Sequence, residues 1–502
     1  MHFVLQVFHH LLARSKMFHY GKSNTFHEEL ICSMDLMIPL QKSSSIPIYE
    51  QLYDGIKTAI LKGQLHKNTK IPSKRQLADF LSISQTTVEL AYGQLLAEGY
   101  IRSESRVGYF VEDILELPYI EQSIPSFEPN GNEQDEIRYN FSPSLIDELS
   151  FPFSTWRKYA KLTIDELHSN LLQTGHRQGE YELRVEIAHY LYHSRGIECQ
   201  PEQIVIGSGT EHLLPMILRL FDEPTKLAFE NPGYSAIPFS QLNDQHVFIP
   251  VDEDGLLVKS LAKSNANIVY VTPSHQFPTG AILSASRRTQ LLKWAMERHD
   301  RYIIEDDYDS EFRYVGKPIA ALQSLDQNNK VIYLSTFTKS LMPSLRVAYF
   351  VLPKPLLQTY NERLSHYTST VPRFDQHILS SFMRDGHFSK HLNKMRKIYR
   401  KKHDKVIQTF SIHYPEVQIT GEEAGMHLLI HVPCDIQEQE LVRRAKKRGI
   451  LISSLSSYLF EQIERKEATF LVGFGGIAFE QIEEAIHALM AVFKAPVVSD
   501  IV

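Results

Sequence analysis

The central segment of the chain reads Tyr333-Leu-Ser-Thr-Phe-Thr-Lys339-Ser-Leu-Met-Pro-Ser-Leu-Arg346. The apolar run 331–334 predicts a buried strand that ends in a hydroxyl-rich turn carrying one lysine. A lysine beside a strand end can be desolvated, which lowers its pKa and suits it to Schiff-base chemistry. Arg346 opens a second apolar run and offers a rigid fork of donors for a phosphate. By itself such a turn more often carries an exposed lysine and a structural arginine, so the surrounding motifs must decide.

Length and composition indicate a globular protein of more than one domain. The 502 residues are enough for two or three domains. The formal net charge of −6 means that any nucleic-acid surface must be local. The three cysteines, Cys32, Cys199 and Cys434, include no CxxC pair, so they predict neither a zinc site nor a disulfide framework.

Residues 1–45 are expected to form a poorly ordered extension. The apolar run 3–12 is interrupted by Gln6, His9 and His10 and has no basic leader. It is a poor signal peptide and too short to span a bilayer. We therefore expect a cytoplasmic protein without a membrane segment.

Residues 46–113 show the pattern of a winged helix-turn-helix. An apolar helical repeat begins at Pro47 and stops at Gly63, and the range 62–78 contains five basic residues and no acidic one. Ser73 and Gln76 form a capping box at the start of a short helix. A turn leads to Ser84, which can cap a third helix, and the range 100–111 reads as a β-wing.

This segment resembles the GntR-type winged-helix domain. The resemblance is carried by the ranges 71–81, 84–92, 95–101 and 108–111, and it implies binding of operator DNA. The residues it assigns to DNA are Ser73, Lys74, Arg75, Gln85, Thr86, Thr87, Arg106 and Gly108. The family often has arginine in place of Gln85, and because glutamine pairs with adenine while arginine prefers guanine, the base preference can differ. The alternative is a small helical domain for protein contacts.

Residues 114–140 are predicted to be an acidic linker that contains several prolines. From residue 141 onward, short apolar runs alternate with amphipathic helical patterns, which predicts an α/β fold with a largely parallel sheet. The expected strands are 204–206, 227–229, 268–271, 302–304, 331–334 and 348–351. In such folds ligands bind at the carboxyl ends of the strands.

Short motifs rich in polar, glycine and proline residues follow four of these strands. Gly207–Glu211 opens a helix, whose N-terminal N–H groups can bind phosphate, and Glu230–Tyr234 is a turn that presents an aromatic ring. Thr272–Gly280 follows the third strand. In Glu305–Asp309, Asp306 and Tyr308 face the same way because side chains alternate along an extended chain. A carboxylate can keep a pyridine nitrogen protonated, which is what pyridoxal phosphate (PLP) needs. The alternative for this acidic run is a divalent metal site, which leaves the other motifs without a role, so we predict no metal.

In this order the motifs resemble those of the fold-type I aminotransferases, over about residues 141–493, and we expect residues 141–502 to form one aminotransferase-like PLP-binding domain. The resemblance implies that Lys339 forms the Schiff base with PLP, that Asp306 pairs with the ring nitrogen and that Tyr308 donates to the ring oxygen O3′. It also implies that Tyr234 stacks on the ring. The residues it assigns to the phosphate are Gly209, Thr210, Thr336 and Arg346. A GntR-type domain linked to such a fold is the architecture of the MocR-type regulators, which implies a homodimer.

Two departures from the aminotransferase pattern bear on activity. Transaminases usually carry asparagine where this chain has Phe277, and phenylalanine cannot donate to O3′. They also clamp the substrate α-carboxylate with an arginine, but Leu471 aligns there and no arginine follows Arg465. Without that clamp an amino acid is poorly oriented. We therefore predict a PLP-binding transcriptional regulator that responds to PLP or to an amine or amino acid reacting with it. The alternatives are an active aminotransferase with an accessory DNA-binding domain and a structural docking module.

Overall fold

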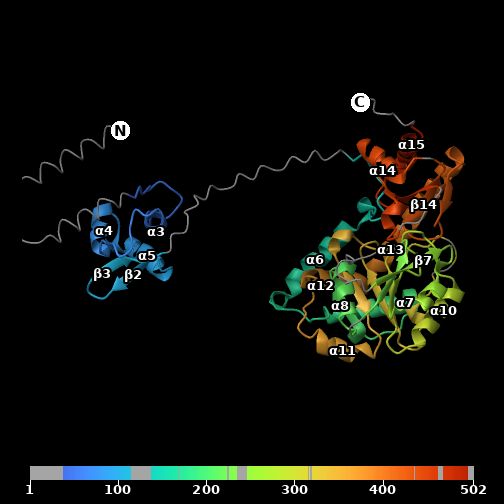
Figure 1. The fold of residues 1–502 in the computed structure, drawn as a ribbon, viewed down its shortest axis with the longest axis horizontal. Helices are drawn as coiled ribbons and strands as arrows, with labels where there is room; N and C mark the ends of the chain where they lie inside the picture. The colour runs from blue at the N-terminus through green and yellow to red at the C-terminus, as the bar shows by residue number, and fades with distance from the viewer. Residues whose placement is uncertain are drawn as a thin grey trace, which may run out of the picture. The chain divides into compact units, whose positions relative to one another are not determined.

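The computed structural model describes residues 38–114, 137–167, 169–222, 225–234, 246–314, 316, 319–434, 436–461 and 467–495. The chain separates into two compact units, with the division between Asn130 and Gly131 (Figure 1). Most of the predicted extension and most of the predicted linker lie outside the described residues. None of the helices within the described ranges is both long and apolar enough to cross a membrane.

The first unit is the predicted winged helix-turn-helix. It contains α3 (Ile48–Leu61), α4 (Lys74–Leu81) and α5 (Gln85–Ala97), with a three-stranded sheet in the order β1-β3-β2. The strands are β1 (Lys70–Ile71), β2 (Ile101–Glu104) and β3 (Gly108–Val111). The capping box of Ser73 and Gln76 is present, and the Ser84 hydroxyl accepts from Thr87 N–H at 3.1 Å. Ile38 and Leu40 pack against the core of this unit, so it begins before residue 46.

The second unit is built on an eight-stranded sheet in the order β5-β12-β11-β10-β9-β6-β7-β8. Its strands are β5 (Ile204–Gly207), β6 (Leu227–Asn231), β7 (His246–Asp252), β8 (Gly255–Leu256), β9 (Ile268–Val271), β10 (Tyr302–Asp307), β11 (Val331–Thr336) and β12 (Ala348–Val351). The five strands from β11 to β7 are mutually parallel, whereas β12 is antiparallel to both of its neighbours. All six strands expected from the sequence are confirmed.

Helices cover both faces of this sheet because its central strands are apolar on both sides. One face packs against α8 (Thr210–Leu218) and α11 (Leu356–Arg363). The other face packs against four helices. They are α7 (Tyr181–Arg195), α9 (Val258–Lys263), α10 (Ala285–Met296) and α12 (Arg373–Arg384). The carboxyl ends of the parallel strands therefore open at one edge of a three-layer unit.

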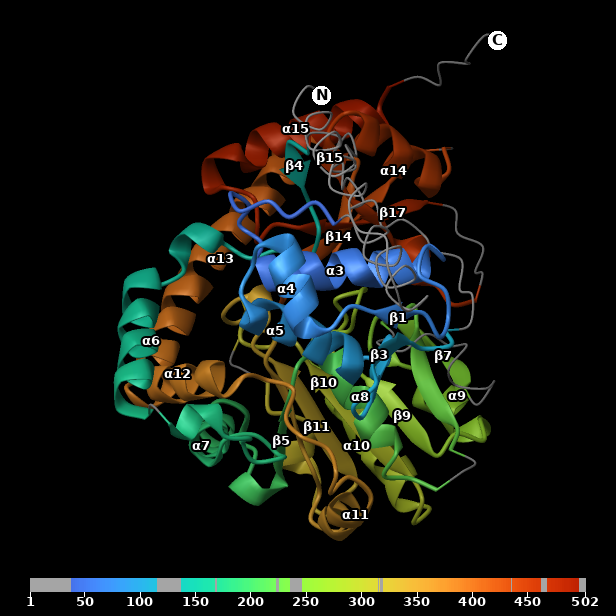
Figure 2. The same ribbon diagram turned by 90° about the vertical axis from the view of Figure 1, so that its left-hand side faces the viewer.

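A smaller C-terminal part forms its own apolar core next to the large sheet. It contains the strands β13 (Gln418–Thr420), β14 (His427–Val432), β16 (Ser453–Ser454) and β17 (Ala468–Gly473), with α14 (Glu438–Lys447) and α15 (Ile482–Phe493). The long helix α13 (His387–His413) packs against both α12 and α15, and α6 (Phe153–Leu167) packs beside α12 (Figure 2). β4 (Tyr139–Asn140) pairs with β15 (Ile450–Leu451), so the end of the predicted linker is part of this unit.

Candidate functional site

One cavity of about 360 Å³ opens at the carboxyl ends of β10 and β11. The sequence motifs that follow β5, β6, β10 and β11 all reach this cavity. It is lined by every residue that the sequence assigned to PLP: Gly209, Thr210, Tyr234, Asp306, Tyr308, Thr336, Lys339 and Arg346. Its volume is in the range of small-molecule sites.

Lys339 lies in the turn after β11, half-buried at the cavity wall. Its ammonium group donates a hydrogen bond to the backbone carbonyl of Pro143. Burial lowers the pKa of Lys339 to about 8, and the nearby charge of Asp309 only partly opposes this shift. A substantial fraction of the amine is therefore neutral near physiological pH, which is the form that attacks a carbonyl carbon.

Asp306 is almost fully buried, with 4% of its surface exposed. Burial raises the pKa of its carboxyl to about 7, although a hydrogen bond from Tyr270 works in the opposite direction. Tyr270 donates to Oδ2, whereas Oδ1 is buried and has no hydrogen-bond partner among the described residues. An unpaired buried acceptor is costly, so this oxygen is suited to a donor that enters the cavity.

The opposite end of the cavity is a cradle for an anion. Gly209, with φ of 136°, precedes the first turn of α8. A Cβ atom there would lie 2.6 Å from Arg346 Nη2 and 2.7 Å from Glu211 Oε2, so only glycine leaves this space open. The N-terminal N–H groups of α8 and the Arg346 guanidinium favour negative charge. Here the Glu211 carboxylate contacts Arg346.

Aromatic rings form the wall between these two ends. The ring of Phe277 meets those of Tyr234, Tyr308 and Tyr458 edge to face, at centroid distances of 6.0, 6.0 and 4.9 Å. Leu471 lies in β17, fully buried in an apolar cluster against which Phe277 packs. Arg346 is the one arginine among the described residues that line the cavity.

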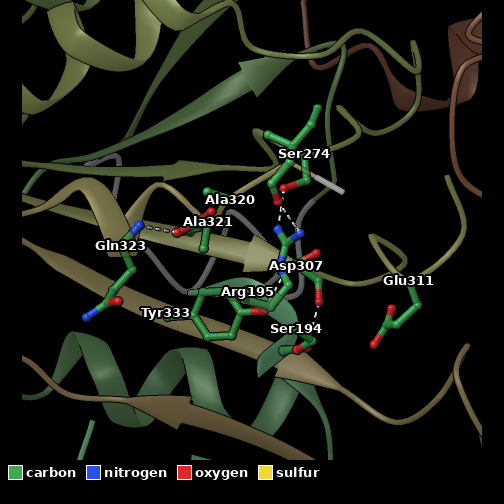
Figure 3. Close-up of polar contacts among 12 residues, drawn as sticks. Ser194, Arg195, Ser274, Asp307, Glu311, Ala320, Ala321, Gln323 and Tyr333 are labelled. Carbon is green, nitrogen blue, oxygen red and sulfur yellow. Dashed lines mark hydrogen bonds and ion pairs between the residues drawn. The ribbon is translucent and has the colours of Figure 1, made fainter. Parts of the chain in front are cut away.

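Carboxylates of the acidic run Glu305–Asp309 face different sides of β10. Glu305 accepts from the N–H groups of Leu322 and Gln323, at 2.7 and 2.8 Å. Asp307 is paired with the buried Arg195 at 2.7 Å, and Figure 3 shows Arg195 between Asp307 and Ser274. Asp306 alone of these three faces the cavity, so the carboxylates of Glu305, Asp306 and Asp307 do not converge on one point.

Other residues of the site were not assigned from the sequence. They are Ser142, Pro143, Ser144, Glu211, Thr272, Thr338, His427 and Tyr458, which line the cavity, and His275 and Asp309, which lie beneath it. His275 and Asp309 stand inside quoted motifs, so their residue types were a usable signal. Ser142–Ser144, His427 and Tyr458 come from distant parts of the chain and stand in no motif that could have identified them.

The residues assigned to DNA lie on the first unit, at the start of α4, at the start of α5 and in the wing. Ser73, Arg75, Gln85, Thr86 and Arg106 are exposed. Lys74 is paired with Glu89 at 2.6 Å, and Thr87 contacts Ser84 at the N-terminus of α5. Gly108 has φ of 141°, and Arg106 has φ of 64° in the wing turn.

Comparisons with known proteins agree with this two-unit arrangement. Residues 147–489 match the family model "Aminotransferase class I and II", and residues 48–111 match "Bacterial regulatory proteins, gntR family". The structure of kynurenine aminotransferase from Pyrococcus horikoshii in complex with PMP is similar, with a TM-score of 0.64 and 26% identity, over 72% of this chain and 92% of that one. Members of this aminotransferase family use PLP as their cofactor.

Two relatives span both units. The "Uncharacterized HTH-type transcriptional regulator YdeL" of Bacillus subtilis (strain 168) is 43% identical over 92% of this chain and 100% of its own length. The "Probable rhizopine catabolism regulatory protein MocR" of Rhizobium meliloti is 33% identical over 91% of this chain and 96% of its own. The chain therefore belongs to the MocR-type transcriptional regulators, in which a GntR-type DNA-binding domain is joined to an aminotransferase-like domain.

Proposed function

We propose that this regulator binds PLP in the cavity at the ends of β10 and β11, and that PLP, or an amine or amino acid reacting with it, changes its affinity for operator DNA. The observation that carries the proposal is Asp306 Oδ1, a buried acceptor without a partner among the described residues. It shares one cavity with an amine of lowered pKa, Lys339, and with the cradle at Gly209 and Arg346. These are the donor, acceptor and anion sites that PLP requires.

Each residue that the sequence assigned to PLP has a role in this proposal. Asp306 would pair with the ring nitrogen, Tyr308 would donate to the ring oxygen, and Tyr234 would cover one ring face. Gly209, Thr210, Thr336 and Arg346 would hold the phosphate. When bound, PLP would supply an aldehyde that can link covalently to Lys339 or to an incoming amine.

The same cavity supports a response to a ligand better than sustained transamination. Phe277 brings an apolar edge where a hydrogen-bond donor is usual, and Leu471 is buried among apolar side chains. Arg346, the arginine that lines the described cavity, belongs to the anion cradle. An amino acid could therefore replace Lys339 on the cofactor while its own carboxylate is left unheld. Holding a substrate in the right orientation supplies much of the barrier reduction in enzymes, so sustained transamination is disfavoured.

An active aminotransferase is the second candidate, because the lowered pKa of Lys339 would also serve catalysis. For regulation, the ligand must bind more tightly to one of two states of the protein that differ in DNA affinity. We propose that the working form is a homodimer, so that two DNA-binding units act on one operator, as two-fold symmetric regulators do.

The proposal is tested on the full-length protein. Purified protein with added PLP should be yellow, and borohydride reduction followed by peptide mass spectrometry should place the cofactor on Lys339. Lys339→Ala should lose the colour, whereas a lysine elsewhere in the unit, Lys354→Ala, should keep it. The PLP assignment is wrong if Lys339→Ala retains the wild-type absorbance.

A further inference from the structure

Two buried titratable side chains that contact each other and Tyr308 are not among the residues that would hold PLP. His275 and Asp309 are each 1% exposed. The Asp309 oxygens lie 3.0 and 3.2 Å from His275 Nδ1. Tyr308 Oη lies 3.0 Å from the same nitrogen and donates to the His275 carbonyl oxygen, also at 3.0 Å. The pair therefore contacts the one residue of the cavity whose hydroxyl would face the ring oxygen.

The direction of these hydrogen bonds follows from the residue types. An ionised carboxylate only accepts, so the hydrogen between Asp309 and His275 belongs to Nδ1. Tyr308 Oη lies at the same distance from Nδ1 and is a second acceptor for that hydrogen. Burial raises the pKa of Tyr308 well above its usual range, so the phenol keeps its proton and is a donor. His275 Nδ1–H can therefore support Tyr308 from below while the phenol donates elsewhere.

We propose that His275 and Asp309 are positioning residues that hold the Tyr308 phenol for donation to the ring oxygen of PLP. This inference rests on the proposed function. Asp309 orients the imidazole, whose Nδ1–H holds the phenol oxygen. The single phenol proton, which the His275 backbone carbonyl accepts in this structure, would turn to the ring oxygen when PLP binds. Hydrogen bonds arranged in such a chain strengthen one another. Phe277 cannot supply a donor from the other side of the cavity, so the support of Tyr308 matters more here.

The pair is sealed by the C-terminal part of the same unit. A Cβ atom on Gly425 would lie 2.0 Å from His275 Cε1 and 2.6 Å from Asp309 Oδ2, so the backbone just before β14 lies directly against both side chains. The His427 ring is 4.8 Å from that of His275, and its Nε2 lies 3.2 Å from the Pro278 carbonyl. The pair is therefore shielded from bulk solvent, which strengthens its hydrogen bonds.

Several other titratable groups surround His275 and Asp309, and a substitution that tests the pair should leave their charges unchanged. Burial lowers the pKa of His427 to about 3, so this neighbour is neutral above that pH. Lys339 and Asp306 are the titratable groups on the cavity side, and Glu230 and Asp307 also act electrostatically on Tyr308. Substitutions at His275 that carry no charge leave all of these groups in place.

The experiment compares substitutions that separate hydrogen bonding from packing. His275→Asn keeps a nitrogen donor attached to Cγ, where Nδ1 is attached in histidine, but it leaves unfilled volume. His275→Leu removes the donor and keeps more of the volume. Asp309→Asn keeps the shape and removes the charge that orients the imidazole. His391→Leu is the matched control, because His391 is a buried histidine of α13 outside the cavity.

The two measurements are PLP affinity and the pH midpoint of the absorbance of PLP bound to the full-length protein. A donated hydrogen bond favours the anionic ring oxygen, so losing it raises the midpoint. We expect His275→Leu to raise it by about 1 pH unit or more and to weaken PLP binding several-fold. Asp309→Asn should shift both in the same direction to a smaller extent. His275→Asn and His391→Leu should match the wild type.

The outcomes distinguish this inference from the proposed function. If His275→Leu behaves like the wild type, or His275→Asn is as impaired as His275→Leu, the pair acts by packing and the inference is overturned. Asp309→Asn provides the same test if His275→Leu does not fold, and an unchanged midpoint there would also overturn it. If wild-type protein and Lys339→Ala show the same absorbance with added PLP, the proposed function itself fails. This inference then fails with it.

Discussion

The carboxylate of Glu211, in the first turn of α8, contacts the guanidinium of Arg346. Both side chains are about half exposed, and both would meet a Cβ atom placed on Gly209. In this arrangement the protein's own anion occupies the cradle that would hold the phosphate of PLP. Binding of the phosphate therefore requires Glu211 to leave Arg346 or to share it against the repulsion of two negative groups.

Replacing Glu211 with glutamine should strengthen PLP binding. Glu211→Gln removes the competing charge and keeps the side-chain size, so we expect a PLP affinity about 3- to 10-fold higher at low salt, with a smaller gain at high salt. Titration of apo protein with PLP, followed by absorbance, measures this. Glu440→Gln is the matched control, because Glu440 pairs with Arg443 and Arg444 on α14. Equal or weaker affinity in Glu211→Gln would show that Glu211 does not compete with the phosphate.

Asp306 should make the PLP-free protein less stable as the pH rises. The pKa of this carboxyl is raised from 3.8 to about 7 by burial, so the folded state holds its proton more tightly than the unfolded state does. Its contribution to stability is therefore complete below about pH 4 and is lost as the pH rises through about 7. Asp306→Asn has no charge to bury. Without PLP, it should exceed the wild type in free energy of unfolding by about 1–3 kcal/mol at pH 8 and equal it at pH 4.

Added PLP should reverse this order at pH 8, because asparagine cannot pair with a protonated ring nitrogen. Thermal unfolding midpoints at both pH values, with and without PLP, measure the effect. Asp165→Asn, at an exposed position of α6, is the control and should change neither midpoint. The thermal unfolding midpoints of wild type and Asp306→Asn, measured without PLP, should differ more at pH 8 than at pH 4. An equal difference at both pH values would contradict the raised pKa of Asp306.

The architecture and about half of the residues that line the cavity could be predicted from the sequence, because short segments of neighbouring residues determine them. Apolar runs such as 268–271 and 331–334 are strands buried on both faces. Residues at or just past the carboxyl ends of such strands, as Asp306 and Lys339 are, must lie at the same edge of a parallel sheet. The capping box at Ser73 is equally local. In these cases a few neighbouring residues contain the whole physical reason for the structure.

The remaining half of the site depends on contacts between distant segments. Pro143 meets Lys339 across 196 positions of the chain, and His427 reaches the cavity from a strand of the C-terminal part. The pairing of Glu211 with Arg346 likewise exists only after α8 and the turn beyond β11 come together. No periodicity or turn signal reports such contacts, so they became visible only in the folded structure.

Arg75 should contribute to DNA affinity through charge. It is exposed in the first turn of α4, beside the Ser73 cap. On a mixed-sequence duplex, Arg75→Ala should bind several-fold more weakly and show a salt slope reduced by about 1 if Arg75 contacts a phosphate. The control is Arg157→Ala, at an exposed position of the second unit. Unchanged affinity and salt slope for Arg75→Ala would remove this residue from the DNA interface.

Amines should change the spectrum and the DNA affinity of the PLP-bound protein without sustained turnover. Lys339 can be displaced because its amine has a lowered pKa, but Leu471 and Phe277 leave an amino acid without the contacts that orient it for catalysis. A panel of amines and amino acids would be mixed with full-length protein, and absorbance, keto-acid formation and DNA affinity followed together. We expect spectral shifts, less than one equivalent of keto acid per cofactor, and altered DNA affinity. Lys339→Ala is the control, because it cannot form the starting covalent link. Multiple turnover at about 1 s⁻¹ or faster, with unchanged DNA affinity, would instead identify the protein as an aminotransferase and rule out the sensor.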